Sequence, residues 1–107
     1  MSIELNRDNF ESETVQSKGA VIVDFWGPQC KPCLALAPAV EQMEKDFPGK
    51  LKVGKVNATG NRMLCARLRV MSLPTFILYR DGAEKARLTG ENLKASEIRA
   101  AVERVLL

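Results

Sequence analysis

Histidine is absent from the 107-residue chain, and cysteine occurs only three times. An odd and small number of cysteines does not make a disulfide-stapled scaffold. A zinc site needs four nitrogen or sulfur ligands, more than one copy of this chain can supply without histidine. A zinc site could then form only from the ligands of several chains together, so we expect no metal.

Long hydrophobic runs are missing as well. No strongly apolar run approaches the roughly 20 residues of a membrane-spanning helix. The first residues, MSIELNRDNF, carry acidic side chains and no apolar stretch behind a basic start, unlike a secretory signal. We therefore expect a cytoplasmic protein that does not contact a membrane.

A basic stripe is the third missing feature. The 16 Lys and Arg residues are scattered among 13 Asp and Glu residues, which leaves a net charge of +3. A protein that follows a nucleic-acid backbone needs a clustered positive surface, so we expect no nucleic-acid partner. Length and an apolar content of 46% are typical of a soluble globular protein, and we expect one domain over residues 1–107.

Short apolar segments alternate with segments of helical periodicity. Residues 20–26, AVIVDFW, predict a strand that is buried on both faces. Apolar residues from Cys33 to Phe47 recur every three or four positions, which predicts one helix, kinked at Pro38. Asp81-Gly82 between two strand-like runs predicts a hairpin.

The remaining segments complete the order β-α-β-α-β-α-β-β-α. We expect a short strand at 3–5, a weak helix at 7–16 capped by Asp8, a strand at 51–57, two helical turns at 61–68, strands at 75–79 and 84–88, and a final helix after Gly90. This order predicts an α/β fold, with a central mixed sheet of four to five strands flanked by helices on both faces.

The segment WGPQCKPC, residues 26–33, lies where the buried strand gives way to the long helix. Cys30 should therefore sit at or just before the helix N-terminus, where unpaired N–H groups and the helix dipole stabilise a thiolate. Cys33 is one turn further on and can resolve a mixed disulfide, while Pro32 suits the first helical turn. The pair can cycle between dithiol and disulfide.

At this point the chain resembles the thioredoxin family over nearly its whole length. The resemblance rests on VDFW before CxPC, a helix that carries Pro38, KVN at 55–57, LPTF at 73–76 and DG at 81–82, in that order and spacing. It implies a thioredoxin fold and a thiol–disulfide oxidoreductase with Cys30 and Cys33 as catalytic residues.

The resemblance also implies a substrate-binding surface. It makes Pro74 a cis proline beside the cysteines and leaves the backbone of Leu73 free to pair with a substrate peptide; without it, Pro74 reads as a trans proline that begins a strand. Trp26 either packs against the active-site loop or fills the core. We assign Trp26, Lys31, Pro32, Leu73 and Pro74 to this surface.

Asp24 is a carboxylate inside an apolar strand, so burial should raise its pKa. By resemblance it accepts or donates a proton for Cys33, which makes it the third catalytic residue. The alternative is a structural ion pair with Lys55, on a neighbouring strand, and both can hold at once. For Cys65, on the third helix, inert packing is favoured over a regulatory thiol.

The chain departs from the family beside the first cysteine. Thioredoxins usually carry WCGPC, whereas Gln29 precedes Cys30 here and Lys31 replaces the glycine between the cysteines. A cation at Lys31 should stabilise the thiolate and make the couple more oxidising. The altered surface leaves open whether an NADPH-dependent thioredoxin reductase serves as electron donor.

We therefore predict a monomeric protein disulfide reductase without a prosthetic group. Its partners would be a thioredoxin-reductase-like electron donor and disulfide-containing client proteins. Two alternatives stay open: a thiol oxidase or isomerase, which differs in redox potential, and a non-catalytic binding or assembly module of the same fold.

Overall fold

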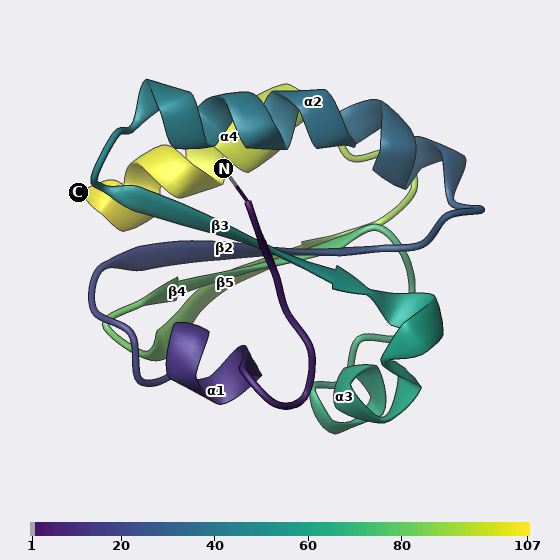
Figure 1. The fold of residues 1–107 in the computed structure, drawn as a ribbon. Helices are drawn as coiled ribbons and strands as arrows, with labels where there is room; N and C mark the ends of the chain where they lie inside the picture. Colours follow the sequence, from purple (N-terminus) through teal and green to yellow (C-terminus); the bar gives the residue numbers. More distant parts are fainter. Residues whose placement is uncertain (1) are drawn as a thin grey trace.

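The structure, a computed structural model, describes residues 2–107. Over these residues the chain forms five strands in one mixed sheet, with four α-helices and a short 3₁₀ helix (Figure 1). The bounds are β1 Ile3–Glu4, α1 Phe10–Glu13, β2 Ala20–Trp26, α2 Lys31–Asp46, β3 Leu51–Asn57, η1 Ala58–Gly60, α3 Arg62–Arg67, β4 Thr75–Arg80, β5 Ala83–Thr89 and α4 Ala95–Leu106.

The sheet has the order β1-β3-β2-β4-β5, so β2 lies at its centre. β2 is parallel to β3 and antiparallel to β4, and β5 returns antiparallel to β4. Six of the seven residues of β2 are buried, as a central strand with helices on both faces requires. The predicted mixed α/β fold is confirmed.

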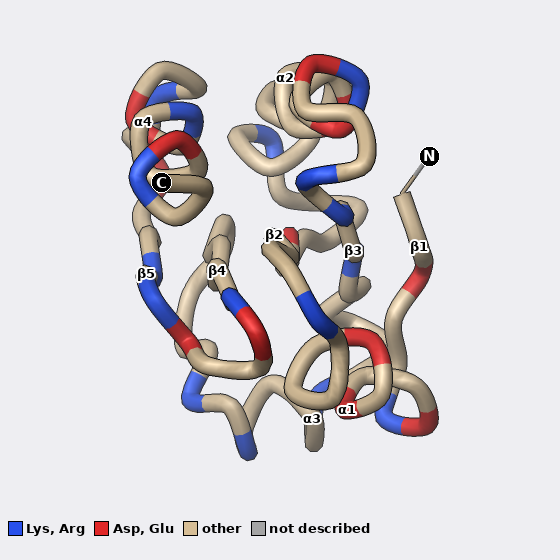
Figure 2. The backbone as a smooth tube through the Cα atoms, turned by 90° about the vertical axis from the view of Figure 1, so that its left-hand side faces the viewer, with Lys and Arg blue, Asp and Glu red and all other residues tan. Residues whose placement is uncertain are grey.

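Helices cover both faces of the sheet. α2 and α4 lie on one face, and α1 and α3 lie on the other (Figures 1 and 2). Successive side chains of each strand point to opposite faces of the sheet, so the apolar residues form two clusters. The cluster under α2 and α4 includes Ile22, Leu36, Val40, Phe76 and Ile98. The cluster beside α1 and α3 includes Leu5, Phe10, Phe25, Leu64 and Ile77.

α2 is a single helix that runs through Pro38, as the periodicity predicts. Its buried side chains are Cys33, Leu36, Val40 and Met43, which form the stripe that packs on the sheet. Among the described residues, no helix is long and apolar enough to cross a membrane.

The hairpin between β4 and β5 forms at Asp81-Gly82, as predicted. Both residues have positive φ, 50° and 87°, which is the backbone that a two-residue hairpin turn requires. A side chain at Gly82 would also clash with the carbonyl oxygen of Val15. The turn therefore needs glycine for its backbone conformation and for its packing.

The N-terminal segment differs from the prediction. The helix expected at 7–16 is only the single turn α1, and Asp8 is not its cap. Asn9 holds the N-cap position, and the N–H of Asp8 instead donates to the side-chain oxygen of Asn6 at 2.8 Å. The side-chain oxygens of Asn6 and Asn9 both accept backbone N–H groups in this turn, whereas the Asp8 carboxylate accepts none among the described residues.

Candidate active site

The loop after β2 places Cys30 at the N-cap of α2. The N–H of Cys30 donates to the carbonyl of Gly27 at 3.0 Å, and this tight turn leads the chain from the end of β2 to the start of α2. Cys30 and Cys33 form a disulfide with 5.2 Å between their Cα atoms. Cys30 is half-buried and Cys33 is buried, so an incoming thiolate or disulfide meets Cys30 first.

The sulfur of Cys30 performs the capping function itself. Its Sγ accepts the backbone N–H of Cys33 at 3.2 Å, which satisfies one of the free donors at the helix start. Pro32 lies in the first turn, and that turn holds no acidic residue. The positive end of the helix dipole therefore acts on the sulfur without a competing carboxylate.

Asp24 is buried in β2, with 1% of its surface exposed, and its Oδ1 atom has no hydrogen-bond partner among the described residues. Loss of hydration raises its pKa from 3.8 to about 7, against the lowering effect of Lys55. The alternation of β2 points Asp24 to the face that α2 covers, the same face on which Cys33 is buried. A carboxyl group that exchanges a proton near neutral pH thus shares a layer with the inner sulfur.

Lys55 is the direct β3 neighbour of Asp24, as expected. No ion pair within 4.0 Å joins them among residues 2–107, so the structural ion pair that the sequence left open is not formed. The ammonium group of Lys55 instead lies over the indole of Trp26, 5.2 Å from the ring centroid. This contact holds Trp26 at the end of β2, immediately before the redox loop.

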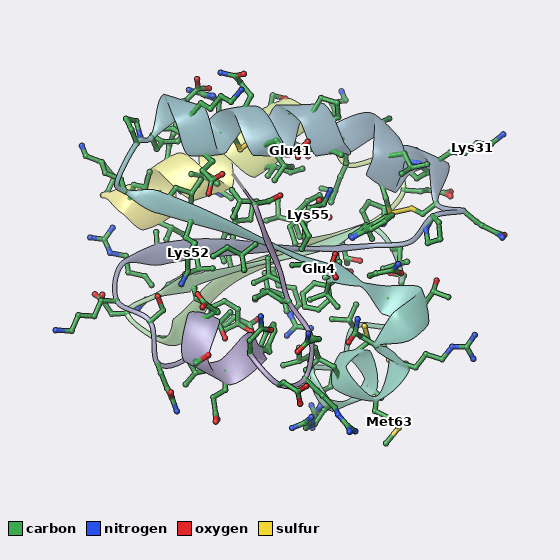
Figure 3. All side chains as sticks on the ribbon, viewed as in Figure 1. Glu4, Lys31, Glu41, Lys52, Lys55 and Met63 are labelled. Atoms are coloured by element: carbon green, nitrogen blue, oxygen red, sulfur yellow. A yellow bond between two sulfur atoms is a disulfide. The ribbon has the colours of Figure 1, made fainter. Side chains whose placement is uncertain are left out.

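Glu41 is a charged neighbour of Asp24 that the sequence did not reveal. Its negative charge contributes to the raised pKa of Asp24. Figure 3 shows Glu41 on the sheet side of α2, above Lys55. The register of α2 on β3 sets this placement, and no motif in the sequence encodes that register.

Leu73 and Pro74 lie beside the redox loop. The Leu73-Pro74 peptide bond is cis, which confirms the expectation from the resemblance. A Cβ atom at Gly27 would lie 3.3 Å from Leu73 Cδ1, so the segment and the loop are in close contact. Neither backbone group of Leu73 makes a hydrogen bond within the described part of the chain. Both groups are thus available to a bound peptide.

Cys65 lies apart from the redox pair, in the cluster beside α1 and α3. It is buried, and loss of hydration raises the pKa of its thiol. Both observations agree with inert packing, because the reactive form is the thiolate.

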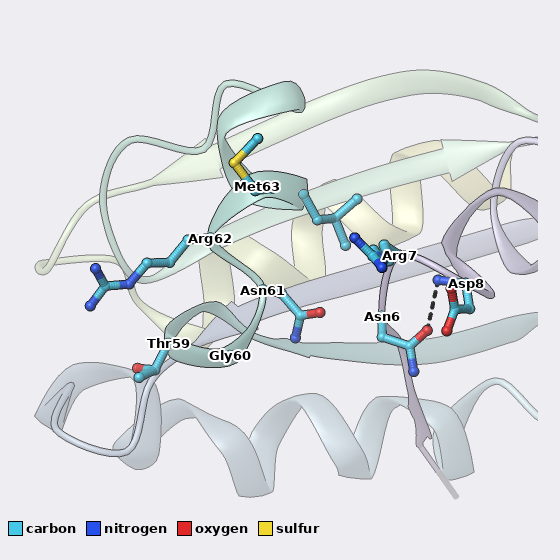
Figure 4. Close-up of a pocket in the computed structure, with 9 residues that line it drawn as sticks. Asn6, Arg7, Asp8, Thr59, Gly60, Asn61, Arg62 and Met63 are labelled. Atoms are coloured by element: carbon cyan, nitrogen blue, oxygen red, sulfur yellow. Dashed lines mark hydrogen bonds between the residues drawn. The ribbon is translucent and has the colours of Figure 1, made fainter.

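A polar hollow beside α3, shown in Figure 4, is lined by residues of the loop after β1 and of the segment 59–64. Neither redox cysteine lines it. Among residues 2–107 no three cysteine or acidic side chains gather in an arrangement that could hold a metal ion.

Comparison with known proteins identifies one family and several similar proteins that share its description. The family model described as Thioredoxin matches residues 1–104. A thioredoxin of Acetoanaerobium sticklandii is 38% identical over 103 residues, which cover 96% of this chain and 98% of that protein. A thioredoxin of Peptoclostridium acidaminophilum is 31% identical and covers 94% and 91%, and one of Haemophilus influenzae is 35% identical and covers 82% of each.

Proposed function

The chain belongs to the thioredoxin family, and from that premise we propose that it works as a protein disulfide reductase. The family and the Cys30–Cys33 pair make it a thiol–disulfide oxidoreductase. The proposal concerns the direction of electron flow and the residues that carry it. The observation that carries the assignment of Cys30 as the attacking residue is that its half-buried sulfur caps a 16-residue helix and accepts the N–H of Cys33.

The reaction follows from the positions of the two sulfurs. The Cys30 thiolate attacks a client disulfide, forms a mixed disulfide and expels one client thiolate, which takes up a proton. The Cys33 thiolate then attacks Cys30 Sγ, closes the intramolecular disulfide and expels the second client thiolate. Two electrons and two protons pass from the protein to the client, and a partner reductase must return them.

Asp24 is the group that we assign to proton transfer with Cys33. Resolution requires the buried Cys33 thiol to lose its proton, and a carboxylate with a pKa of about 7 can accept it at neutral pH. We therefore propose Cys30, Cys33 and Asp24 as the catalytic residues, with Lys55 as a neighbour that limits the rise in the pKa of Asp24.

Substrate binding would use the surface beside Cys30. The unpaired backbone groups of Leu73 can pair with an extended client segment, in the way that an added strand pairs with a sheet edge. Trp26, Lys31 and Pro32 border the same loop, together with Pro74. We propose that no prosthetic group takes part and that the protein acts as a cytoplasmic monomer.

Reduction of insulin by dithiothreitol tests the proposal. The reduced wild-type protein should accelerate precipitation of the insulin B chain, and Cys30→Ser should abolish the acceleration. Cys65→Ser is the matched control, because Cys65 is buried away from the pair. Full activity of Cys30→Ser, or none in the wild type, would overturn the enzymatic assignment. Client binding that survives in an inactive wild type would favour the binding module.

A second candidate, a thiol oxidase or isomerase, is favoured by one observation. Lys31 is exposed at the first position of α2, beside the sulfur, and the first turn carries no acid to offset it. Stabilising the thiolate makes a disulfide couple more oxidising. Titration of the Cys30–Cys33 couple in glutathione buffers separates the two roles, because a reductase requires a potential near or below about −230 mV, in the range of thioredoxins and glutaredoxins.

A further inference from the structure

Leu73 lies in a stretch of chain that the backbone itself does not hold in place. We call residues 68–75, from the C-cap of α3 to the first residue of β4, the Leu73 segment. Among the described residues, no backbone–backbone hydrogen bond involves residues 71–73. The direction of the free N–H and carbonyl of Leu73 therefore depends on what fixes the two ends of the Leu73 segment.

Arg87 of β5 fixes the end that follows α3. Its Nη1 atom donates to the carbonyl oxygens of Leu68 and Arg69, at 2.9 and 3.2 Å. The carboxylate of Glu84 accepts from Nε and Nη2 of the same guanidinium, at 2.9 and 3.0 Å, and such a two-point pair fixes the plane of the group. Arg87 thus ties the last carbonyls after α3 to the sheet.

Three hydroxyl groups fix the other end. Thr75 Oγ1 donates to the carbonyl oxygen of Ser72 at 2.7 Å, and Thr89 Oγ1 lies 2.9 Å from the hydroxyl oxygens of both Ser72 and Thr75. A hydroxyl group has one proton to donate. Because Thr75 donates to the Ser72 carbonyl, Thr89 donates to Thr75 and accepts from Ser72. We call Ser72, Thr75 and Thr89 the hydroxyl ring, since its bonds begin and end on Ser72.

Thr89 is the member of the hydroxyl ring that belongs to β5. Its Oγ1 atom lies between the two other hydroxyl groups, and it also approaches the carbonyl oxygen of Pro74 at 3.3 Å. The next residue, Gly90, donates its N–H to the same carbonyl at 3.2 Å. Bonds in such a chain polarise and strengthen one another. The end of β5 therefore holds the chain directly after Leu73.

Both attachments lie on one face of β5. Arg87 and Thr89 are two residues apart in the strand, so their side chains point to the same side. Leu88 between them packs against the apolar cluster under α2 and α4. Arg87 and Thr89 thus point to the opposite face, where α3 and the Leu73 segment lie.

We propose that Arg87 and Thr89 are positioning residues for client binding, because they hold the Leu73 segment with the N–H and carbonyl of Leu73 directed at an incoming peptide. This inference rests on the proposed reductase function and on the pairing of a client backbone with Leu73. Loss of either attachment lets the segment adopt further conformations, and the apparent affinity falls with the fraction that stays competent to bind. The exchange chemistry at the sulfurs should not change.

Two disulfides separate client binding from chemistry. One is a synthetic peptide whose intramolecular disulfide is flanked by extended segments. The other is 2-hydroxyethyl disulfide, which has no peptide backbone to pair with Leu73. Each is mixed in excess with the reduced protein, and acid-quenched samples report how fast the Cys30–Cys33 disulfide forms. For the peptide, the dependence of this rate on concentration gives a half-saturating concentration and a limiting rate.

Thr89→Val removes the hydroxyl group and keeps a β-branched side chain in the strand. The half-saturating peptide concentration should rise about fivefold, the effect of losing about one hydrogen bond that keeps the segment competent. The limiting rate and the rate with 2-hydroxyethyl disulfide should stay within about twofold of the wild type. Thr89→Ser restores a hydroxyl group at the same position and should return the half-saturating concentration close to the wild-type value.

Arg87→Gln tests the other attachment, with Arg99→Gln as its matched control. Both substitutions remove a guanidinium that is paired with a carboxylate. Arg99 pairs with Asp46 at the end of α2 and makes no hydrogen bond to the Leu73 segment within the described part of the chain. Arg87→Gln should raise the half-saturating peptide concentration, and Arg99→Gln should leave it unchanged.

An unchanged half-saturating concentration in Thr89→Val and Arg87→Gln, or an equal loss of rate with both disulfides, would overturn the proposal and leave the reductase function intact. A defect in Thr89→Val that Thr89→Ser does not restore would overturn it as well. If Thr89→Val fails to fold, Arg87→Gln compared with Arg99→Gln decides. Failure of the wild type to reduce either disulfide would overturn the reductase function, and this inference with it.

Discussion

Asp24 and Lys55 are direct neighbours across the β2–β3 pair, yet the lysine ammonium lies over Trp26 and forms no ion pair with the carboxylate. The lysine therefore lowers the pKa of Asp24 only partly, and burial dominates. A buried carboxyl group whose pKa lies near 7 costs folding free energy when it is ionised. Stability and proton transfer are thus linked through one residue.

Asp24→Asn should change how stability depends on pH. The folded protein holds the Asp24 proton up to about pH 7, whereas the unfolded chain releases it near pH 4. Stability from this group is therefore complete below about pH 4 and is lost as pH rises through 7, by at most about 4 kcal/mol. Asp24→Asn should lack this loss and be more stable than the wild type at pH 8.

Urea unfolding of the oxidised protein at pH 5 and pH 8 measures the effect, since disulfide-bonded cysteines do not titrate. Asp8→Asn is the control, because Asp8 is exposed. Identical pH slopes for the wild type and Asp24→Asn would contradict the argument.

Lys31→Gln should make the Cys30–Cys33 potential more negative. The variant removes a cation beside the Cys30 thiolate, which destabilises the reduced form. An exposed charge at a helix end contributes about 0.3–1 kcal/mol, which corresponds to about 6–20 mV for a two-electron couple. Glutathione-buffer titration measures the shift, with Lys50→Gln as the control far from the sulfurs. A shift toward positive values would reject the electrostatic explanation.

Gly82→Ala should destabilise the fold by about 2 kcal/mol or more, because the new Cβ meets both a positive φ and the Val15 carbonyl. Gly49→Ala has a comparable φ of +74° and open space around the new atom, so only the backbone penalty of about 1 kcal/mol applies. Urea unfolding compares the two. Equal losses would show that the contact with Val15 adds nothing.

Cys65 should react slowly with iodoacetamide in the native, reduced protein. Burial restricts access and raises the pKa of the thiol, so little thiolate is present at pH 8. Cys30 should be modified first, and Cys65 only after unfolding in urea. Peptide mapping of the labelled protein identifies the sites. Rapid modification of Cys65 in the folded state would indicate an accessible and potentially regulatory thiol.

The sequence predicted the elements whose signals are local. β2 is a continuous apolar run, α2 has a clear 3.6-residue period, and Asp81-Gly82 has the composition of a tight hairpin turn. The placement of Cys30 at the start of α2 follows from the same local patterns. The motif around Pro74 was informative only through the resemblance, because cis and trans prolines look alike in a sequence.

Contacts set by the packing of distant segments could not be predicted. Glu41 approaches Asp24 only because α2 packs on β3 in one register, and Thr59 lies near Gly27 of the redox loop only because η1 packs beside that loop. η1 itself is three residues long, begun by the Asn57 side chain, which accepts the N–H of Thr59. Three residues are too few to show a periodic pattern.

The residue that starts α2 is also the one that attacks. Serine, threonine, aspartate and asparagine are better helix caps than cysteine, so replacing Cys30 by one of them removes the nucleophile while offering the helix an equal or stronger start. A variant with serine at position 30 would therefore separate the two roles of this residue, because it keeps a cap for α2 and lacks the attacking thiol.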